Sequence, residues 1–226
     1  MKTSLLLPIS CFSLCLGVSV INPASARAGT IAIYSNLGAG QSFNTAQGWE
    51  IDGGIATDQV IANAFMTSIT ATLSGVQLAL GSIVGLDTMN VYLESDSSGA
   101  PGLIVTQLIQ QGSIAAFTSP SGGGGLVTYT CAACPRLVAG TPYWLVAFES
   151  DPTTLIEWNW NSTGDAGTGG NFAYNNSGGL SGPWSEDTGD ARGAFEVDAV
   201  TVSEPGAWWL LASGLAGVAL MLRHLR

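Results

Sequence analysis

Acidic side chains are the residues of this 226-residue chain best suited to acid–base chemistry, because it holds 16 Asp and Glu but one His. Two carboxylates could hydrolyse a glycosidic bond, one as general acid and one as base or nucleophile. Glu149, Asp151 and Glu157 lie near predicted strand ends and are the candidates. A solvated surface position is the default for each, since carboxylates are rarely buried. We therefore expect no catalytic residues.

Oxygen ligands for Ca²⁺ occur in two short segments. Glu186, Asp187 and Asp190 form one, and Asp96 with Ser97 forms the other. Neither has the spacing of an EF-hand loop, and Asp with Gly is common in turns. Residues 29–203 contain no His and no Lys, which removes His-based triads and Schiff-base chemistry. We expect no metal and no cofactor.

The pair Cys131 and Cys134 is the sharpest motif. In a β-turn, residues i and i+3 come within ~7 Å, which allows a disulfide, whereas an extended strand separates them by ~10 Å. Zinc would need two further ligands, and a thioredoxin-type motif would open a helix. The pair predicts a structural disulfide, which is typical of exported proteins.

Trp158 and Trp160 occupy one face of a predicted strand, because side chains alternate along strands. Exposed, the two rings are candidates for stacking on sugars. Facing inward, they are core residues, which is the commoner place for Trp. The sequence leaves both interpretations open.

Strand signals dominate the segment that carries these residues. The predicted strands, with alternating apolar positions or β-branched and aromatic runs, are 30–35, 59–66, 70–80, 89–94, 126–131, 143–148, 155–160 and 193–200. Gly- and Ser-rich turns separate them, and no helical pattern intervenes. The sequence predicts one all-β domain at 29–203, an antiparallel β-sandwich or jelly-roll-like fold.

The charge of the chain is strongly negative. The formal net charge is −10, with 46% hydrophobic and 10% charged residues. Between residues 29 and 203, only Arg136 and Arg192 oppose fifteen acids. This composition argues against disorder and against a coiled coil, and the shortage of cations excludes nucleic acid as a partner.

Residues 1–28 predict a secretory signal peptide. Lys2 supplies the positive start, residues 5–21 are largely apolar, and two Ala-x-Ala sites at 24–26 and 26–28 fit cleavage. An uncut N-terminal membrane anchor is the alternative.

The C-terminal residues predict a single transmembrane helix at 207–222. Sixteen apolar residues span about 24 Å, short of a ~30 Å hydrocarbon core. Trp208 and Trp209 would lie at one interface, with Arg223 and Arg226 on the cytoplasmic side. A buried core helix is the alternative, but the segment is apolar on all sides.

The tail resembles the PEP-CTERM sorting signal of Gram-negative bacteria. Val202, Glu204 and Pro205 match its core, and Ser203 replaces the first Pro of that family. The resemblance implies recognition at residues 204–226 by an exosortase, removal near the motif, and export alongside exopolysaccharide.

The body resembles the choice-of-anchor R domain. The resemblance is carried by Tyr34-Ser35-Asn36-Leu37-Gly38, Gly48-Trp49-Glu50-Ile51, Ala64-Phe65, the segment 91–102, Thr141-Pro142-Tyr143-Trp144-Leu145 and the segment 184–195. It implies an extracellular β domain joined to a surface anchor, and it supplies no catalytic residues.

Together these features predict an exported cell-envelope or extracellular-matrix protein with a membrane-anchored precursor. Its expected partners are the export machinery, an exosortase, the membrane and exopolysaccharide. A carbohydrate-binding module is the alternative, and a carboxylate-based glycosidase is a third.

Overall fold

A computed structural model describes residues 29–118, 122–166, 172–187 and 189–201 of the chain. This part consists of strands, turns and loops, which confirms the predicted all-β class. No helix within it has the length and hydropathy needed to cross a membrane. The predicted signal peptide and the predicted tail helix lie outside the described residues.

The strands are short to medium in length, and β4 is the longest. They are β1 (Gly29–Ser35), β2 (Phe43–Asp52), β3 (Val60–Met66), β4 (Ala71–Val84), β5 (Asn90–Ser97), β6 (Ala100–Gln111), β7 (Phe117–Thr118), β8 (Gly122–Gly123), β9 (Gly125–Thr130), β10 (Arg136–Leu137), β11 (Pro142–Phe148), β12 (Leu155–Asn161), β13 (Phe172–Asn175), β14 (Ser185–Asp187) and β15 (Phe195–Thr201).

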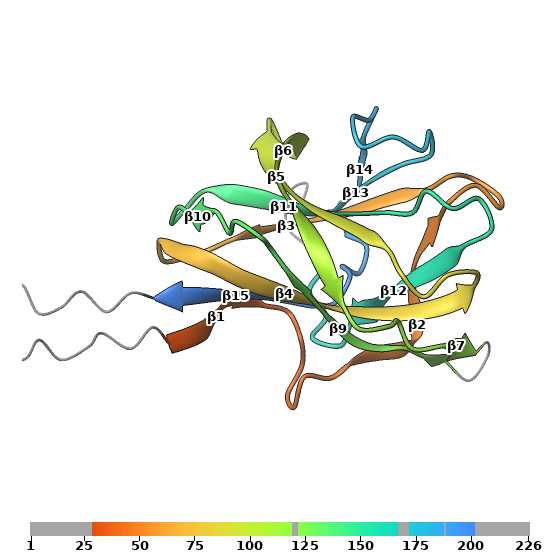
Figure 1. Cartoon of the computed structure of the whole chain (residues 1–226), viewed down its shortest axis with the longest axis horizontal. Helices are drawn as coiled ribbons and strands as arrows, with labels where there is room; N and C mark the ends of the chain where they lie inside the picture. Colours follow the sequence, from red (N-terminus) through yellow and green to blue (C-terminus); the bar gives the residue numbers. More distant parts are fainter. Residues whose placement is uncertain (1–28, 119–121, 167–171, 188, 202–226) are drawn as a thin grey trace, which may run out of the picture. The chain divides into compact units, whose positions relative to one another are not determined.

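The strands form one curled antiparallel sheet that folds into a sandwich-like arrangement (Figure 1). In one layer, β15 and β9 pair with opposite edges of β4, and β1 extends the layer beyond β15. β12 pairs with the C-terminal part of β4 and carries β2. The other layer runs β6-β5-β11-β3-β13-β14, and β6 joins the layers because it pairs with both β5 and β9.

The space between the layers is filled by the inward-facing residues of each strand. The largest fully buried side chains there include Trp158, Tyr129, Phe172 and Phe195. Phe195 contacts Phe65 and Trp158 edge-on, an arrangement that aromatic rings favour. The alternation of side chains along the strands therefore determines which residues form this core, as the sequence predicts.

The outer face of the second layer is also buried. Val60, Ala62, Ala64, Trp144, Val146 and Ala173 form a second apolar cluster on this face. Leu180 and Trp184, from the segment between β13 and β14, pack against it. Burial on both faces explains why β3 and β11 are almost entirely apolar, with Asn63 the one polar residue in β3.

All eight strands predicted from the sequence are present, as β1, β3, β4, β5, β9, β11, β12 and β15. Two long strands, β2 and β6, were not predicted. β2 is mostly polar, and β6 begins with Ala100-Pro101-Gly102, which favours a turn. Their pairing with β12 and β5, respectively, holds them in extended form despite these weak local signals.

Candidate functional site

A groove of about 680 Å³ opens between β5, β6 and the turn that joins β11 to β12. Its apolar lining consists of buried Met89 and Leu108 and the more exposed Leu86 and Ile109, together with Pro152. Its polar lining includes Asn90, Gln107, Gln110, Glu149 and Asp151. Two of the candidate carboxylates, Glu149 and Asp151, thus lie in one concave site.

Two backbone N–H groups of the β11–β12 turn hold the Glu149 side chain in a fixed orientation. Its Oε1 accepts hydrogen bonds from the backbone N–H groups of Ser150 and Asp151, both at 2.8 Å. The side chain is only 4% exposed. Oε2 makes no hydrogen bond within the described part of the chain, although the residue lines the groove. The second carboxylate oxygen of Glu149 is therefore available to a bound group.

Asp151 stabilises the same turn. Its Oδ1 accepts hydrogen bonds from the hydroxyl and the backbone N–H of Thr153, which lower the pKa of Asp151 below its ordinary value. Asp in this position commonly closes such a turn by bonding a backbone N–H two residues on. Glu149 and Asp151 thus belong to one turn, two residues apart in sequence.

Gln110 fixes the opposite side of the groove. Its Oε1 accepts from the N–H of Met89 at 2.9 Å and from the Tyr129 hydroxyl at 3.1 Å. Its Nε2 donates to the carbonyls of Asp87 and Gly112. Burial raises the pKa of Tyr129, and the nearby charge of Glu149 raises it further, so Tyr129 is a neutral donor to Gln110.

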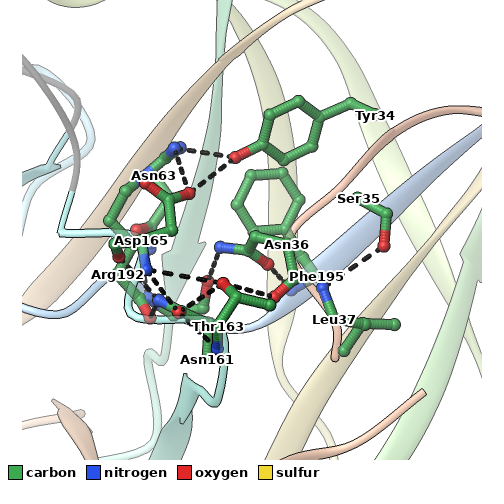
Figure 2. Close-up of polar contacts among 11 residues, drawn as sticks. Tyr34, Ser35, Asn36, Leu37, Asn63, Asn161, Thr163, Asp165, Arg192 and Phe195 are labelled. Atoms are coloured by element: carbon green, nitrogen blue, oxygen red, sulfur yellow. Dashed lines mark hydrogen bonds and ion pairs between the residues drawn. The ribbon is translucent and has the colours of Figure 1, made fainter. Parts of the chain in front are cut away.

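A second polar cluster is centred on Arg192 (Figure 2). Its Nη1 donates to the Tyr34 hydroxyl at 2.7 Å and to Asp165 Oδ2 at 3.0 Å. The guanidinium also lies 5.7 Å and 5.6 Å from the ring centroids of Tyr34 and Phe195. Burial raises the pKa of Tyr34 to about 12, which keeps its hydroxyl protonated.

Three asparagines complete the Arg192 cluster (Figure 2). Asn36 donates to the Gly193 carbonyl and accepts from the Phe195 N–H. Asn161 donates to the carbonyls of Asp165 and Arg192, and Asn63 accepts from the Gly193 N–H. These bonds satisfy backbone groups where β15 begins. Arg192 itself is 3% exposed, and the cluster ties strands together.

The predicted tryptophan pair does not form a sugar-stacking platform. Trp158 is fully buried, and its Nε1 donates to the Ala194 carbonyl at 3.0 Å. Trp160 is partly buried against Trp49, with ring centroids 5.6 Å apart. The candidate stacking role of Trp158 is therefore wrong, because its face of β12 points into the core.

The predicted disulfide between Cys131 and Cys134 is confirmed, with the two Cα atoms 5.1 Å apart. It closes the turn after β9, immediately before β10. Asp96, a candidate calcium ligand, is engaged in the fold: its Oδ1 accepts from Trp144 Nε1 and its Oδ2 from the Gly99 N–H. The described residues contain no group of three or more His, Cys, Asp or Glu placed to hold a metal.

Glu157, the third candidate carboxylate, lies away from the groove. It is 7% exposed on β12, directly opposite Glu50 of β2. Burial, with a further contribution from the charge of Glu50, raises the pKa of Glu157. The candidate sorting motif, Val202 to Pro205, and the candidate anchor residues Trp208, Trp209, Arg223 and Arg226 lie outside the described residues.

Glu94 is a buried acid that the sequence analysis did not single out. It is fully buried on β5, and neither carboxylate oxygen has a hydrogen-bond partner in the described part of the chain. Its alternation with Leu93 is visible in the sequence and suggests a polar face. The second apolar cluster forms on that same face. The alternation therefore predicts a solvent-exposed face, whereas in the fold this face is buried.

Comparison of the chain with models of protein families finds no match, and neither does comparison with curated proteins.

Proposed function

We propose that this chain is an exported, non-catalytic β domain that is delivered to the bacterial cell envelope or extracellular matrix by a C-terminal sorting signal. In this proposal, residues 1–28 direct secretion. Residues 204–226 hold the precursor in the membrane through a helix at 207–222, until an exosortase acts near Glu204 and Pro205. The disulfide of Cys131 and Cys134 supports this proposal, because such bonds persist in oxidising compartments.

The pairing of the two ends of the domain carries the proposal. Gly29, the first residue of β1, lies directly opposite Thr201, the last residue of β15. Figure 1 shows β1 and β15 side by side. Cleavage before Gly29 and after Thr201 leaves every strand pairing of the domain intact. This arrangement suits a domain whose two flanking segments are removed during export.

Fractionation combined with intact mass spectrometry tests the proposal. We expect the released protein to lack residues from both ends and to be recovered outside the cytosol. The variant carrying Glu204→Gln and Pro205→Ala should accumulate in the membrane with its tail, whereas Asp198→Asn, a matched loss of one carboxylate on β15, should be processed normally. Full-length protein in the cytosol would contradict export, and normal release of the double variant would contradict recognition through this motif.

Carbohydrate recognition is the second candidate function, because one groove combines fixed polar groups with aliphatic side chains. From the sequence, Trp158 and Trp160 were the candidate residues for this function. Because Trp158 is in the core, we take the groove as the candidate surface instead.

A further inference from the structure

We infer that the groove between β5, β6 and the β11–β12 turn is a saccharide-binding site, selective for neutral or amine-bearing glycans over acidic ones. The inference rests on the proposed function, since only an exported domain would meet such a polymer. Its volume of about 680 Å³ is within the range of about 300–1,000 Å³ that is usual for ligand sites.

Glu149 supplies the fixed acceptor of this site. Two backbone N–H groups hold its Oε1, so the carboxylate does not have to be ordered when a ligand binds. Glu149 lines the groove, and its Oε2, which has no partner in the described residues, can accept from a sugar hydroxyl. Hydrogen bonds to a charged acceptor are stronger than those between neutral groups.

Asn90 and Gln107 supply groups that both donate and accept. The Gln107 Nε2 contacts Asn90 Oδ1 at 3.4 Å, at the long limit for a hydrogen bond. Apart from this contact, both side-chain amides can turn towards a ligand. Amides suit sugar hydroxyls, because each hydroxyl is also both donor and acceptor.

The exposed aliphatic side chains of the groove suit the C–H faces of a sugar ring. Leu86 and Ile109, which are 48% and 50% exposed, provide this surface. A ligand with alternating hydroxyl edges and C–H faces can use the carboxylate and amides together with these aliphatic carbons. A wholly apolar ligand would leave Glu149 desolvated and unpaired, which is costly.

Charge decides which glycans fit. The groove lining contains two carboxylates and no basic residue. Arg192 is buried in its own cluster, and Arg136 lies on β10, so within the described part neither cation lines the groove. A uronic acid, sulfate or phosphate group would meet like charge, whereas a hydroxyl or an ammonium group would not.

Calorimetric titration of the full chain, solubilised in detergent and kept in EDTA, tests the inference. The probes are three hexasaccharides: cellohexaose (neutral), chitosan hexamer (amine-bearing) and hexagalacturonate (acidic). We expect at least one of the first two to bind at least tenfold more tightly than the third. Failure of both to bind, or equally tight binding of the acidic probe, would overturn the inference.

Two variants locate the site. Glu149→Gln retains an amide Oε1 that accepts the two turn N–H groups, and it should weaken binding by about tenfold or more. Gln107→Ala removes an exposed side chain whose loss should not disturb folding, and it should weaken binding several-fold. Glu50→Gln, a matched change on β2 outside the groove, should bind as the parent does. Unchanged binding by both groove variants would show that the groove is not the site.

The experiments distinguish failure of the saccharide site from failure of the export proposal. Binding is measured on the full chain and does not depend on processing, whereas export is measured by fractionation and does not depend on Glu149. A released protein that binds none of the probes overturns only the saccharide site. A chain that binds the chitosan hexamer but stays in the cytosol overturns only the export proposal.

Discussion

Two buried carboxyl groups, Glu94 and Asp52, respond to burial in opposite ways. Glu94 has no hydrogen-bond partner in the described residues, and desolvation raises its pKa from an ordinary value of 4.5 to about 7. Burial alone would also raise the pKa of Asp52. However, four backbone N–H groups donate to its carboxylate and lower its pKa below 3.8. Hydrogen bonding to the carboxylate, rather than its burial, decides whether the pKa is raised or lowered.

Glu94 is expected to make the domain less stable as the pH rises. The folded-state pKa is above the unfolded-state value, so its contribution is complete below about pH 4.5 and is lost as the pH rises through about 7. Glu94→Gln should therefore stabilise the protein by about 3 kcal/mol at pH 8 relative to its effect at pH 4. Urea unfolding at both pH values measures this difference.

The control for this prediction is Glu186→Gln, which removes a carboxylate from an exposed position on β14. It separates the effect of Glu94 from the change in net charge. If Glu94→Gln loses stability between pH 4 and pH 8 as steeply as the parent, then Glu94 is not the group that titrates.

At the scale of the element, Asp52 organises the turn that follows β2. The backbone N–H groups of Gly54, Ile55, Ala56 and Thr57 all donate to its carboxylate, at 2.6–2.9 Å. Asp52→Ala should cost about 2–3 kcal/mol near neutral pH, because charged hydrogen bonds are lost and donors are left unpaired. Asp52→Asn, which retains one acceptor oxygen, should cost less.

The sign of the pH dependence tests this assignment. Since the folded-state pKa of Asp52 is lowered, its stabilisation is present above about pH 3.8 and is lost as the pH falls. The difference between Asp52→Ala and the parent should therefore shrink in acid, as measured by chemical unfolding. A difference that stays constant from pH 7 to pH 2 would contradict a role for the ionised carboxylate.

The disulfide is a local feature of the turn between β9 and β10. Its partners are three residues apart in sequence, so it closes a small loop. The loop-entropy estimate for so short a loop is about 2 kcal/mol at most. Replacing both Cys131 and Cys134 by Ser should thus lower the free energy of unfolding by no more than about 2 kcal/mol. Loss of folding in the double variant would indicate a larger role than a turn clamp.

For the whole molecule, the paired ends of the domain lead us to expect that its flanking segments are dispensable for folding. The pairing of Gly29 with Thr201 closes the described sheet at both ends of the domain. Deletion of 206–226 should leave the domain folded, with cooperative unfolding and an unchanged near-UV circular dichroism spectrum, but misaddressed in cells. Unfolding of the deletion variant would show that the tail is part of the core.

Eight of the strands and one covalent contact follow from local sequence patterns alone. Alternating side chains at 89–94 and 155–160 predict strands because the period of two is a local property of the backbone. The spacing of Cys131 and Cys134 likewise predicts a turn-closing disulfide on local grounds, since a β-turn brings residues i and i+3 within ~7 Å. Neither prediction required knowledge of distant segments.

Which residues pack against each strand face is known only from the tertiary structure. Alternation assigns Glu94 and Leu93 to opposite faces, but residues far along the chain, Leu180 and Trp184, cover the face that carries Glu94. The groove likewise combines side chains from β5, β6 and the β11–β12 turn. Trp158 is in the core because its face of β12 packs between the layers. Such contacts depend on long-range packing, which no local pattern specifies.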